Sequence, residues 1–206
     1  MLLDFLAESK ADIIGLQEVL DDDPARKIIE PLTAMGYQSV FASVAKKSSS
    51  GKTWTDGPAV FSKYPISSSE KFVLNEEKPR AAVRADIQIG GTTLHVFSTH
   101  LIHTHQKQDD FQDAQVETLL QLLPNEKTIV MGDFNAASDS GVIQKMQSRL
   151  NDSDPSSAPT WSVFPAGCKI CNPYSLYTRL DYIFTSKDLK THSPAVGNST
   201  ASDHLP

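Results

Sequence analysis

Cysteine is scarce in this 206-residue sequence, and its scarcity limits the kinds of site the chain can form. The only two cysteines, Cys168 and Cys171, form a single Cys-x-x-Cys pattern in a polar stretch with nearby prolines. A zinc site with four ligands would need partners that no second cysteine pair supplies. The two thiols are therefore expected to form a loop disulfide or to stay free.

Long apolar runs and an excess of positive charge are also missing. No stretch approaches the roughly 18 consecutive apolar residues of a membrane-spanning helix, and residues 1–10 lack the basic start and long apolar run of a signal peptide. We therefore expect no secretion signal and no membrane span, which favours the cytoplasm. The formal net charge of −6 disfavours a surface that neutralises many phosphates along a nucleic acid. Binding of short nucleic acids through the lysines at 46, 47 and 52 stays open.

The pattern of apolar residues predicts a mixture of helices and strands within one domain, 1–206. Segments rich in glycine and serine separate the elements, and Gly90-Gly91 predicts a tight hairpin. Segment 46–55 is rich in Ser, Gly and Lys and is predicted to be a mobile loop. The expected helices cover 1–10, 24–35, 108–123 and 142–150, and the expected strands cover 11–17, 37–44, 58–62, 66–74, 80–89, 92–100, 129–131 and 180–184.

The most informative stretch is Thr128–Asn135, where a short apolar strand is followed by Gly-Asp-Phe-Asn. Side chains alternate along a strand, so Asp133 and Asn135 are expected on one side of its end and Phe134 in the packing on the other. A carboxylate beside a carboxamide can hold a divalent cation and a water, or orient a phosphate oxygen. The competing interpretation is an ordinary turn after a strand.

Other polar residues also stand at the ends of apolar strands or inside them. Glu18 ends the first strand and His100 ends the strand 92–100, which are positions where α/β proteins place catalytic groups. Asp181 lies inside the apolar run Leu-Asp-Tyr-Ile-Phe, where an ionised carboxylate needs a partner. Arg80 is either a charge at the rim or a phosphate contact. His103 and His105 follow His100 closely, but their polar loop favours solvated side chains over metal ligands.

Taken together, five motifs on strand ends occur in a specific order. They are Gln-Glu at 17–18, Ser-Thr-His-Leu at 98–101, Gly-Asp-Phe-Asn at 132–135, Arg-Leu-Asp-Tyr-Ile-Phe at 179–184 and Ser-Asp-His-Leu-Pro at 202–206. In this order and approximate spacing the sequence resembles the deoxyribonuclease-I-like endonuclease/exonuclease/phosphatase superfamily. The resemblance covers almost the whole chain.

The resemblance implies a four-layered α/β sandwich, in which two mixed, mostly antiparallel sheets pack face to face with helices outside. It also implies hydrolysis of a phosphoester with Mg²⁺ or Mn²⁺, held by Glu18 with Asp203 nearby. Asp133 would position or deprotonate the attacking water, and Asn135 and His100 would bind phosphoryl oxygens. The remaining implied roles are a hydrogen bond from His204 to Asp181, a phosphate contact for Arg80, and orientation of His100 by Asp56. Whether His204 or Asp133 is the base stays open.

Two expectations qualify this assignment. Against the family pattern the first strand and the last core strand are missing, so the domain is expected to be trimmed at both ends. A non-catalytic binding module on the same scaffold is the alternative from another functional class, and a nuclease acting on DNA or RNA is the alternative within the superfamily. The number of polar groups at strand ends favours catalysis over binding alone. The expected activity is hydrolysis of a phosphodiester or, as in a phosphatase, of a phosphomonoester.

Overall fold

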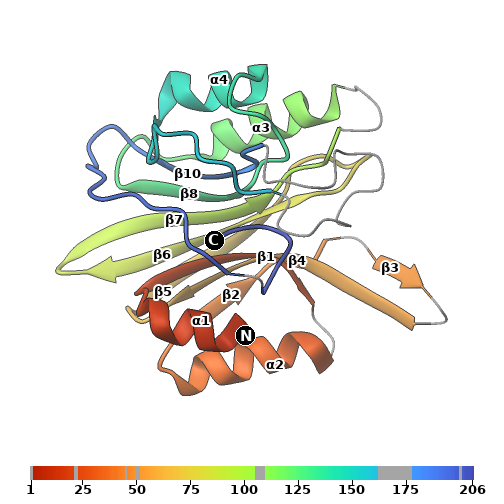
Figure 1. Ribbon diagram of the computed structural model, residues 1–206, viewed down its shortest axis with the longest axis vertical. Helices are drawn as coiled ribbons and strands as arrows, with labels where there is room; N and C mark the ends of the chain where they lie inside the picture. Colours follow the sequence, from red (N-terminus) through yellow and green to blue (C-terminus); the bar gives the residue numbers. More distant parts are fainter. Residues whose placement is uncertain are drawn as a thin grey trace.

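The computed structural model describes residues 2–20, 23–44, 46–49, 52–104, 110–161, 178–199 and 201–206. Two β-sheets lie face to face, and a pair of helices covers the outer face of each (Figure 1). The layers in order are α1 and α2, the first sheet, the second sheet, and α3 with α4. This is the predicted four-layered sandwich of mixed, mostly antiparallel sheets.

The second sheet carries most of the polar strand ends found in the sequence. Its strand order is β5-β6-β7-β8-β10-β9, and only the β7–β8 pair is parallel. A parallel neighbour requires a crossover connection, and helix α3 between β7 and β8 belongs to it. The strands are β5 Ile66–Val73, β6 Ala81–Ile89, β7 Thr92–His100, β8 Thr128–Asp133, β9 Asn151–Asp152 and β10 Asp181–Thr185.

The first sheet is smaller and has the order β1-β4-β2, with β3 paired to the far end of β4. All of its pairs are antiparallel. Among the described residues β1 pairs with β4 alone, so its other edge has no strand partner. The strands are β1 Ile13–Leu20, β2 Gln38–Phe41, β3 Lys46–Ser49 and β4 Lys52–Ser62.

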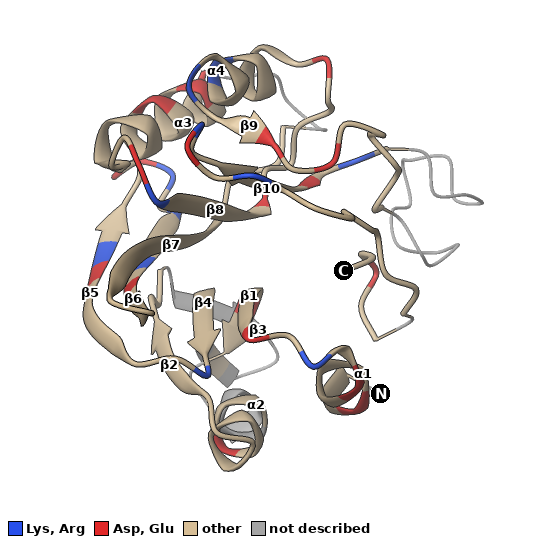
Figure 2. Cartoon of the chain, turned by 90° about the vertical axis from the view of Figure 1, so that its left-hand side faces the viewer, with Lys and Arg blue, Asp and Glu red and all other residues tan. Residues whose placement is uncertain are grey.

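The four helices of the described residues lie on the outside of the sandwich, two against each sheet (Figure 2). α1 and α2 contribute to the apolar cluster under the first sheet, and α3 and α4 to the cluster over the second. None of the helices in the described ranges is long and apolar enough to cross a membrane. The helices are α1 Leu2–Ser9, α2 Asp23–Ala34, α3 Phe111–Leu122 and α4 Gly141–Arg149.

Strand β8 shows how the sequence produces the layered core. Val130 packs toward α3 and α4, whereas Ile129 and Met131 contact the cluster between the two sheets. Both faces of the strand are therefore covered, which explains why its sequence is a continuous apolar run and not an alternating one. Phe134 is fully buried and makes edge-to-face contacts with two aromatic rings of β10, as expected for a packing residue.

The predicted loop at 46–55 is wrong in its described part. β3 and the beginning of β4 form an antiparallel ribbon there, with Lys46 opposite Thr55 and Ser49 opposite Lys52. A ribbon outside the core is held by backbone hydrogen bonds, which need no apolar side chains, so the polar composition gave no signal of it. Three predicted features, the cysteines Cys168 and Cys171 and the side chain of His105, lie outside the described residues.

Candidate active site

The site begins with the parallel pairing of β7 and β8, which brings their last residues together. His100 is the register partner of Asp133, and His100 Nε2 lies 3.4 Å from Asp133 Oδ2. The approach is close because Gly132 has no side chain, since a Cβ there would stand 2.2 Å from the carbonyl oxygen of Thr99. Both residues are buried.

Asn135 folds back onto Asp133 and fixes its carboxylate. The backbone N–H of Asn135 donates to Asp133 Oδ1 at 2.8 Å, and Nδ2 of its side chain donates to Asp133 Oδ2 at 3.2 Å. Nδ2 also donates to the carbonyl oxygen of Leu101 at 3.0 Å. Asn135 lies outside the strand with a φ of 49°, a left-handed conformation that asparagine tolerates better than most residues. The two side chains thus meet through a turn, and not through strand alternation as the sequence suggested.

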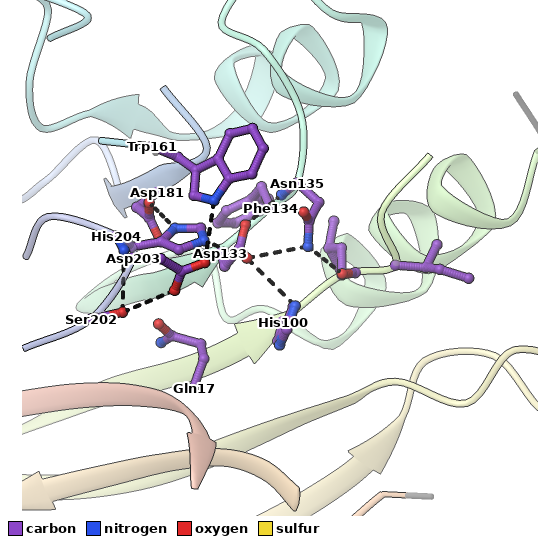
Figure 3. Close-up of polar contacts among 12 residues, drawn as sticks. Gln17, His100, Asp133, Phe134, Asn135, Trp161, Asp181, Ser202, Asp203 and His204 are labelled. Carbon is purple, nitrogen blue, oxygen red and sulfur yellow. Dashed lines mark hydrogen bonds and ion pairs between the residues drawn. The ribbon is translucent and has the colours of Figure 1, made fainter. Parts of the chain in front are cut away.

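His204 and Asp181 form a hydrogen-bonded pair beside Asp133 (Figure 3). Asp181 begins β10 and is the register partner of Asp133 on β8, which places two carboxylates on adjacent strands. His204 Nδ1 lies 2.8 Å from Asp181 Oδ2, and His204 Nε2 lies 3.9 Å from Asp133 Oδ2. Asp133 therefore stands between two histidines, His100 and His204.

Thr160 and Trp161 support this pair, although no sequence motif marks either of them as a site residue. The Thr160 hydroxyl donates to Asp181 Oδ2 at 2.6 Å, and its oxygen accepts the backbone N–H groups of Leu180 and Asp181. Trp161 Nε1 donates to Asp203 Oδ2 at 3.4 Å, and its ring centroid lies 6.2 Å from that of His204. The sequence signal was an apolar residue beside a threonine in a polar loop, which is too common to indicate a function.

The surroundings of Asp133 and of His204 raise the pKa values of both residues. The shift favours the neutral form of the aspartate and the charged form of the histidine. Burial, together with the charge of Asp181, raises the pKa of Asp133 to about 7. Burial alone would lower the pKa of His204, but the hydrogen bond to Asp181 and the surrounding carboxylates outweigh it and raise the pKa to about 9. At neutral pH His204 is therefore positively charged, and Asp133 is close to its own titration point.

A second group of predicted residues lines a small pocket on the other side of His100. Glu18, Asp56 and Arg80 line it together with His100. Glu18 is exposed and has a φ of 54°, within a β-bulge between Leu16 and Val19 where the pairing of β1 with β4 shifts register. Bulges redirect side chains near functional sites, and this one presents Glu18 at the pocket.

Within the described residues, one group of side chains has the spacing of metal ligands. One ligand atom from each of Asp133, Asp181 and His204 lies within 4.8 Å of the others. Neither of the metal ligands predicted from sequence, Glu18 and Asp203, belongs to this group. His204 Nδ1 and Asp181 Oδ2 are already hydrogen-bonded to each other, so a cation bound through these two atoms would have to displace that hydrogen bond.

A groove of about 910 Å³ opens onto the site from the side of β1. Seven consecutive residues of β1, Ile13–Val19, line it, together with Asp181 and His204. Successive side chains of a strand point to opposite faces, so a groove that touches all seven runs along the strand's unpaired edge. Apolar residues of α1, including Phe5, form another part of its wall.

The nine residues predicted from sequence thus fall into two groups of the same site. Asp133 with Asn135 and Asp181 with His204 form two neighbouring hydrogen-bonded pairs, and Asp203 is next to His204 in the sequence. Glu18, Asp56, Arg80 and His100 line the small pocket. The contact of 3.4 Å between His100 Nε2 and Asp133 Oδ2 connects the two groups.

This arrangement can be compared with known proteins. The sequence model of the Endonuclease/Exonuclease/phosphatase family matches residues 1–204. The chain belongs to this family. Endonuclease/exonuclease/phosphatase proteins are hydrolases that act on phosphoester bonds. A search of curated proteins found no match.

Solved structures of the same family share the fold. An endonuclease/exonuclease/phosphatase family protein from Leptotrichia buccalis is 22% identical, with a TM-score of 0.73 over 99% of this chain and 88% of that one. The catalytic domain of human Nocturnin, solved with a bound sulfate anion, is 24% identical, with a TM-score of 0.69 over 99% and 82%. A mannosyl-6-phosphatase from Bacteroides thetaiotaomicron is 18% identical, with a TM-score of 0.66 over 99% and 86%.

Proposed function

We propose that this protein is a divalent-metal-dependent phosphodiesterase that hydrolyses its substrate by in-line attack of an activated water. The observation that carries the proposal is the position of the Asp133 carboxylate between His100 and the His204–Asp181 pair. An in-line attack on phosphorus needs a group that orients the water and fixed donors for the oxygens that gain negative charge. Membership in a family of phosphoester hydrolases supports the reaction class.

Asp133 is the residue that we assign to the attacking water. A general base works best when its pKa is close to the working pH, and burial raises the pKa of Asp133 to about 7. Asn135 holds the carboxylate by donating to both of its oxygens, so the carboxylate has a fixed direction. We infer that Asp133 accepts the proton of the water as the oxygen attacks phosphorus.

His204 is assigned to stabilising charge and to the departing oxygen. Its pKa of about 9 keeps it protonated at neutral pH, so Nδ1–H donates to Asp181 and Nε2–H is a charged donor on the side of Asp133. Asp181 fixes the orientation of the ring and stabilises its positive charge, as carboxylates paired with histidine do in other hydrolases. A protonated imidazole can transfer its proton to an alkoxide that leaves phosphorus.

Asn135, His100 and Arg80 are the candidate donors for phosphoryl oxygens. Both Nδ2 donors of Asn135 are engaged, one with Leu101 and one with Asp133, so contact with a phosphoryl oxygen requires Nδ2–H to turn away from Asp133. Arg80 shares the small pocket with His100, where its positive charge would attract an anionic substrate. Asp56 lines that pocket too, and we propose that it orients His100.

We propose that Glu18 binds the cation and that Asp203 is the second acid of the cation site. Carboxylate oxygens are the ligands that Mg²⁺ and Mn²⁺ prefer, and the exposed Glu18 carboxylate at its bulge fits this donor chemistry. A bound divalent ion would supply electrostatic stabilisation of the phosphoryl charge. The Asp133–Asp181–His204 group is assigned to proton transfer, because the hydrogen bond between His204 Nδ1 and Asp181 Oδ2 already engages two of its ligand atoms.

The first experiment measures hydrolysis of bis-p-nitrophenyl phosphate and of p-nitrophenyl phosphate with Mg²⁺, with Mn²⁺ and with EDTA. We expect turnover of the diester that requires the metal and is abolished by EDTA and by His204→Ala. Turnover that persists in EDTA would refute the proposed metal dependence. Turnover of the monoester alone would indicate a phosphatase, the activity named for the Bacteroides thetaiotaomicron relative.

Two other functions are outcomes of the same experiment when it is extended to oligonucleotides. A nuclease would cleave them with a steep dependence on salt, because binding would rest on phosphate neutralisation, and the formal charge of −6 disfavours this outcome. Binding of a phosphorylated ligand without turnover would indicate a binding module. The similar structures include ANGEL2, a 2′,3′-cyclic phosphatase, and a sphingomyelinase C from Streptomyces griseocarneus. A cyclic and a lipid diester therefore belong in the substrate screen.

A further inference from the structure

Helix α3 carries two buried glutamines one turn apart, close to the ends of β7 and β8. Gln112 is 7% exposed and Gln115 is fully buried. A carboxamide inside a protein must be hydrogen-bonded, because an unpaired polar group there is costly. The identity of the partners therefore indicates what each glutamine holds in place.

The side chain of Gln112 binds the backbone of both strand ends that form the site. Its Nε2 donates to the carbonyl oxygen of Ile102 at 2.8 Å, and to those of Phe134 and Asn135 at 3.0 Å each. The amide group has two hydrogens for these three acceptors, so one hydrogen is shared. The turn after β8 and the segment after β7 are thereby held to a single nitrogen.

This nitrogen supports the same turn that orients the Asp133 carboxylate. Asn135 has a left-handed backbone, a conformation that non-glycine residues keep only where the surrounding structure enforces it. From this conformation the Asn135 N–H reaches Asp133 Oδ1 and its side chain reaches Leu101. Gln112 binds the opposite side of the turn, through the carbonyl oxygens of Phe134 and Asn135.

We propose that Gln112 is a positioning residue of the active site: it holds the turn at 134–135 so that Asn135 and Asp133 keep their reactive geometry. The inference rests on the proposed function, since it assigns a residue that acts through Asn135 and Asp133 in that reaction. Within the hydrogen bonds of the described residues, Gln112 acts on backbone carbonyls and through them on the site.

Gln115 provides a matched control on the same helix. It is also buried, and it also holds Ile102, because its Oε1 accepts the Ile102 N–H at 2.9 Å. Its Nε2 donates to the carbonyl oxygen of Lys78, and in the described part of the chain its side chain makes no hydrogen bond to the turn at 134–135. Gln112→Leu and Gln115→Leu each replace a buried carboxamide by an apolar side chain of similar size, but only the first releases the turn.

The kinetic test compares these two variants with the wild type on bis-p-nitrophenyl phosphate with Mg²⁺. We expect Gln112→Leu to lower kcat about tenfold to a hundredfold, because small displacements of catalytic groups have effects of that size, and Gln115→Leu to stay within about threefold. The loss should fall on kcat more than on KM, because Asp133 acts on the attacking water. Equal kcat values for the two folded variants would overturn the inference. If Gln112→Leu does not fold, Gln112→Asn takes its place, because it keeps the carboxamide but is one methylene shorter.

A second measurement separates this inference from the proposed function. In a ¹H–¹⁵N spectrum the Asn135 backbone amide reports its hydrogen bond to Asp133, so its signal should shift and its hydrogen exchange accelerate about tenfold in Gln112→Leu but not in Gln115→Leu. If the wild type lacks all phosphoesterase activity and this difference is seen, the proposed function fails and the positioning of the turn stands. If the wild type is inactive and the Asn135 amide is unchanged in Gln112→Leu, both fail.

Discussion

The two groups of the site differ in how far the protein itself fixes them. Asp133 and Asn135 are buried and hydrogen-bonded to each other. Beside them, the partly buried Asp181 and His204 form a second hydrogen-bonded pair. Glu18, by contrast, is exposed on a bulge with a left-handed backbone. The difference teaches that the proton-transfer group is organised by hydrogen bonds before a substrate arrives, whereas the Glu18 carboxylate is suited to be ordered by a cation.

The largest expected effect comes from removing Asp133 or His204, the two residues to which proton transfer is assigned. Asp133→Ala and His204→Ala should each lower kcat for bis-p-nitrophenyl phosphate by at least about a thousandfold, within the range for loss of a general acid or base. His192, which is exposed, is the control, and His192→Ala should keep the activity of the wild type. Activity of His204→Ala within tenfold of the wild type would remove His204 from the mechanism.

A smaller effect, which depends on the Mg²⁺ concentration, is expected when the proposed cation ligand Glu18 is changed. Glu18→Gln keeps the shape of the side chain and removes its charge, so it should lower activity about a hundredfold at low Mg²⁺ and recover in part as Mg²⁺ is raised. Asp133→Asn should not recover. A Mg²⁺ titration of both variants, with Glu8→Gln on α1 as the control, measures the contrast. The same Mg²⁺ requirement in Glu18→Gln and the wild type would contradict the assignment of the cation.

The pH dependence of kcat distinguishes the two possible bases. If Asp133 is the base, protonation of its carboxylate abolishes activity, so kcat should fall about tenfold for each pH unit below the Asp133 pKa of about 7. If protonated His204 donates to the departing oxygen, kcat should also fall above the His204 pKa of about 9. Because Asp133 and His204 interact, the two pKa values read from the pH profile describe the pair and not either residue alone. Rates from samples quenched in alkali measure the profile, and a steady rise up to pH 9 would make neutral His204 the base.

The smallest expected effect comes from the hydroxyl of Thr160, which donates to the Asp181 carboxylate. Thr160→Val removes the hydrogen bond to Asp181 Oδ2 and the acceptor of two backbone N–H groups. We expect kcat to fall about fivefold and the free energy of unfolding to fall by about 1–3 kcal/mol, the usual effect of leaving buried polar groups unpaired. Thr191→Val, at an exposed threonine, is the control for the change of residue type. Unchanged kcat in a destabilised Thr160→Val would leave Thr160 with a structural role only.

The main strands could be predicted because their apolar patterns are local, whereas the layered fold was implied by the resemblance of the five ordered motifs to a known family. The apolar run before Gly132 and the hairpin at Gly90-Gly91 reappear as β8 and the β6–β7 connection. The ribbon of β3 was missed because its polar sequence has no alternation of apolar residues, and the two-residue strand β9 is too short to produce a pattern.

For the site, the sequence identified the residues that stand at strand ends but not those that hold them. Asp133 and His100 follow apolar runs, so their positions were recognisable. Gln112 and Thr160 form side-chain hydrogen bonds to groups that are about 20 residues away in the sequence. Such contacts have no periodicity, so only the folded chain reveals them. The bulge that presents Glu18 was invisible for the same reason, because it arises from the register of β1 against β4.

The parallel register of β7 and β8 also determines which changes of chain length the site can tolerate. His100 and Asp133 are partners in one ladder of backbone hydrogen bonds, so their separation is set by the count of residues along two strands. Inserting or deleting a single residue within either strand would turn its terminal side chain to the opposite face of the sheet. Indels inside β7 and β8 should therefore abolish the site even where the domain still folds, whereas the hairpin at Gly90-Gly91, at the other end of β7, should accept added residues.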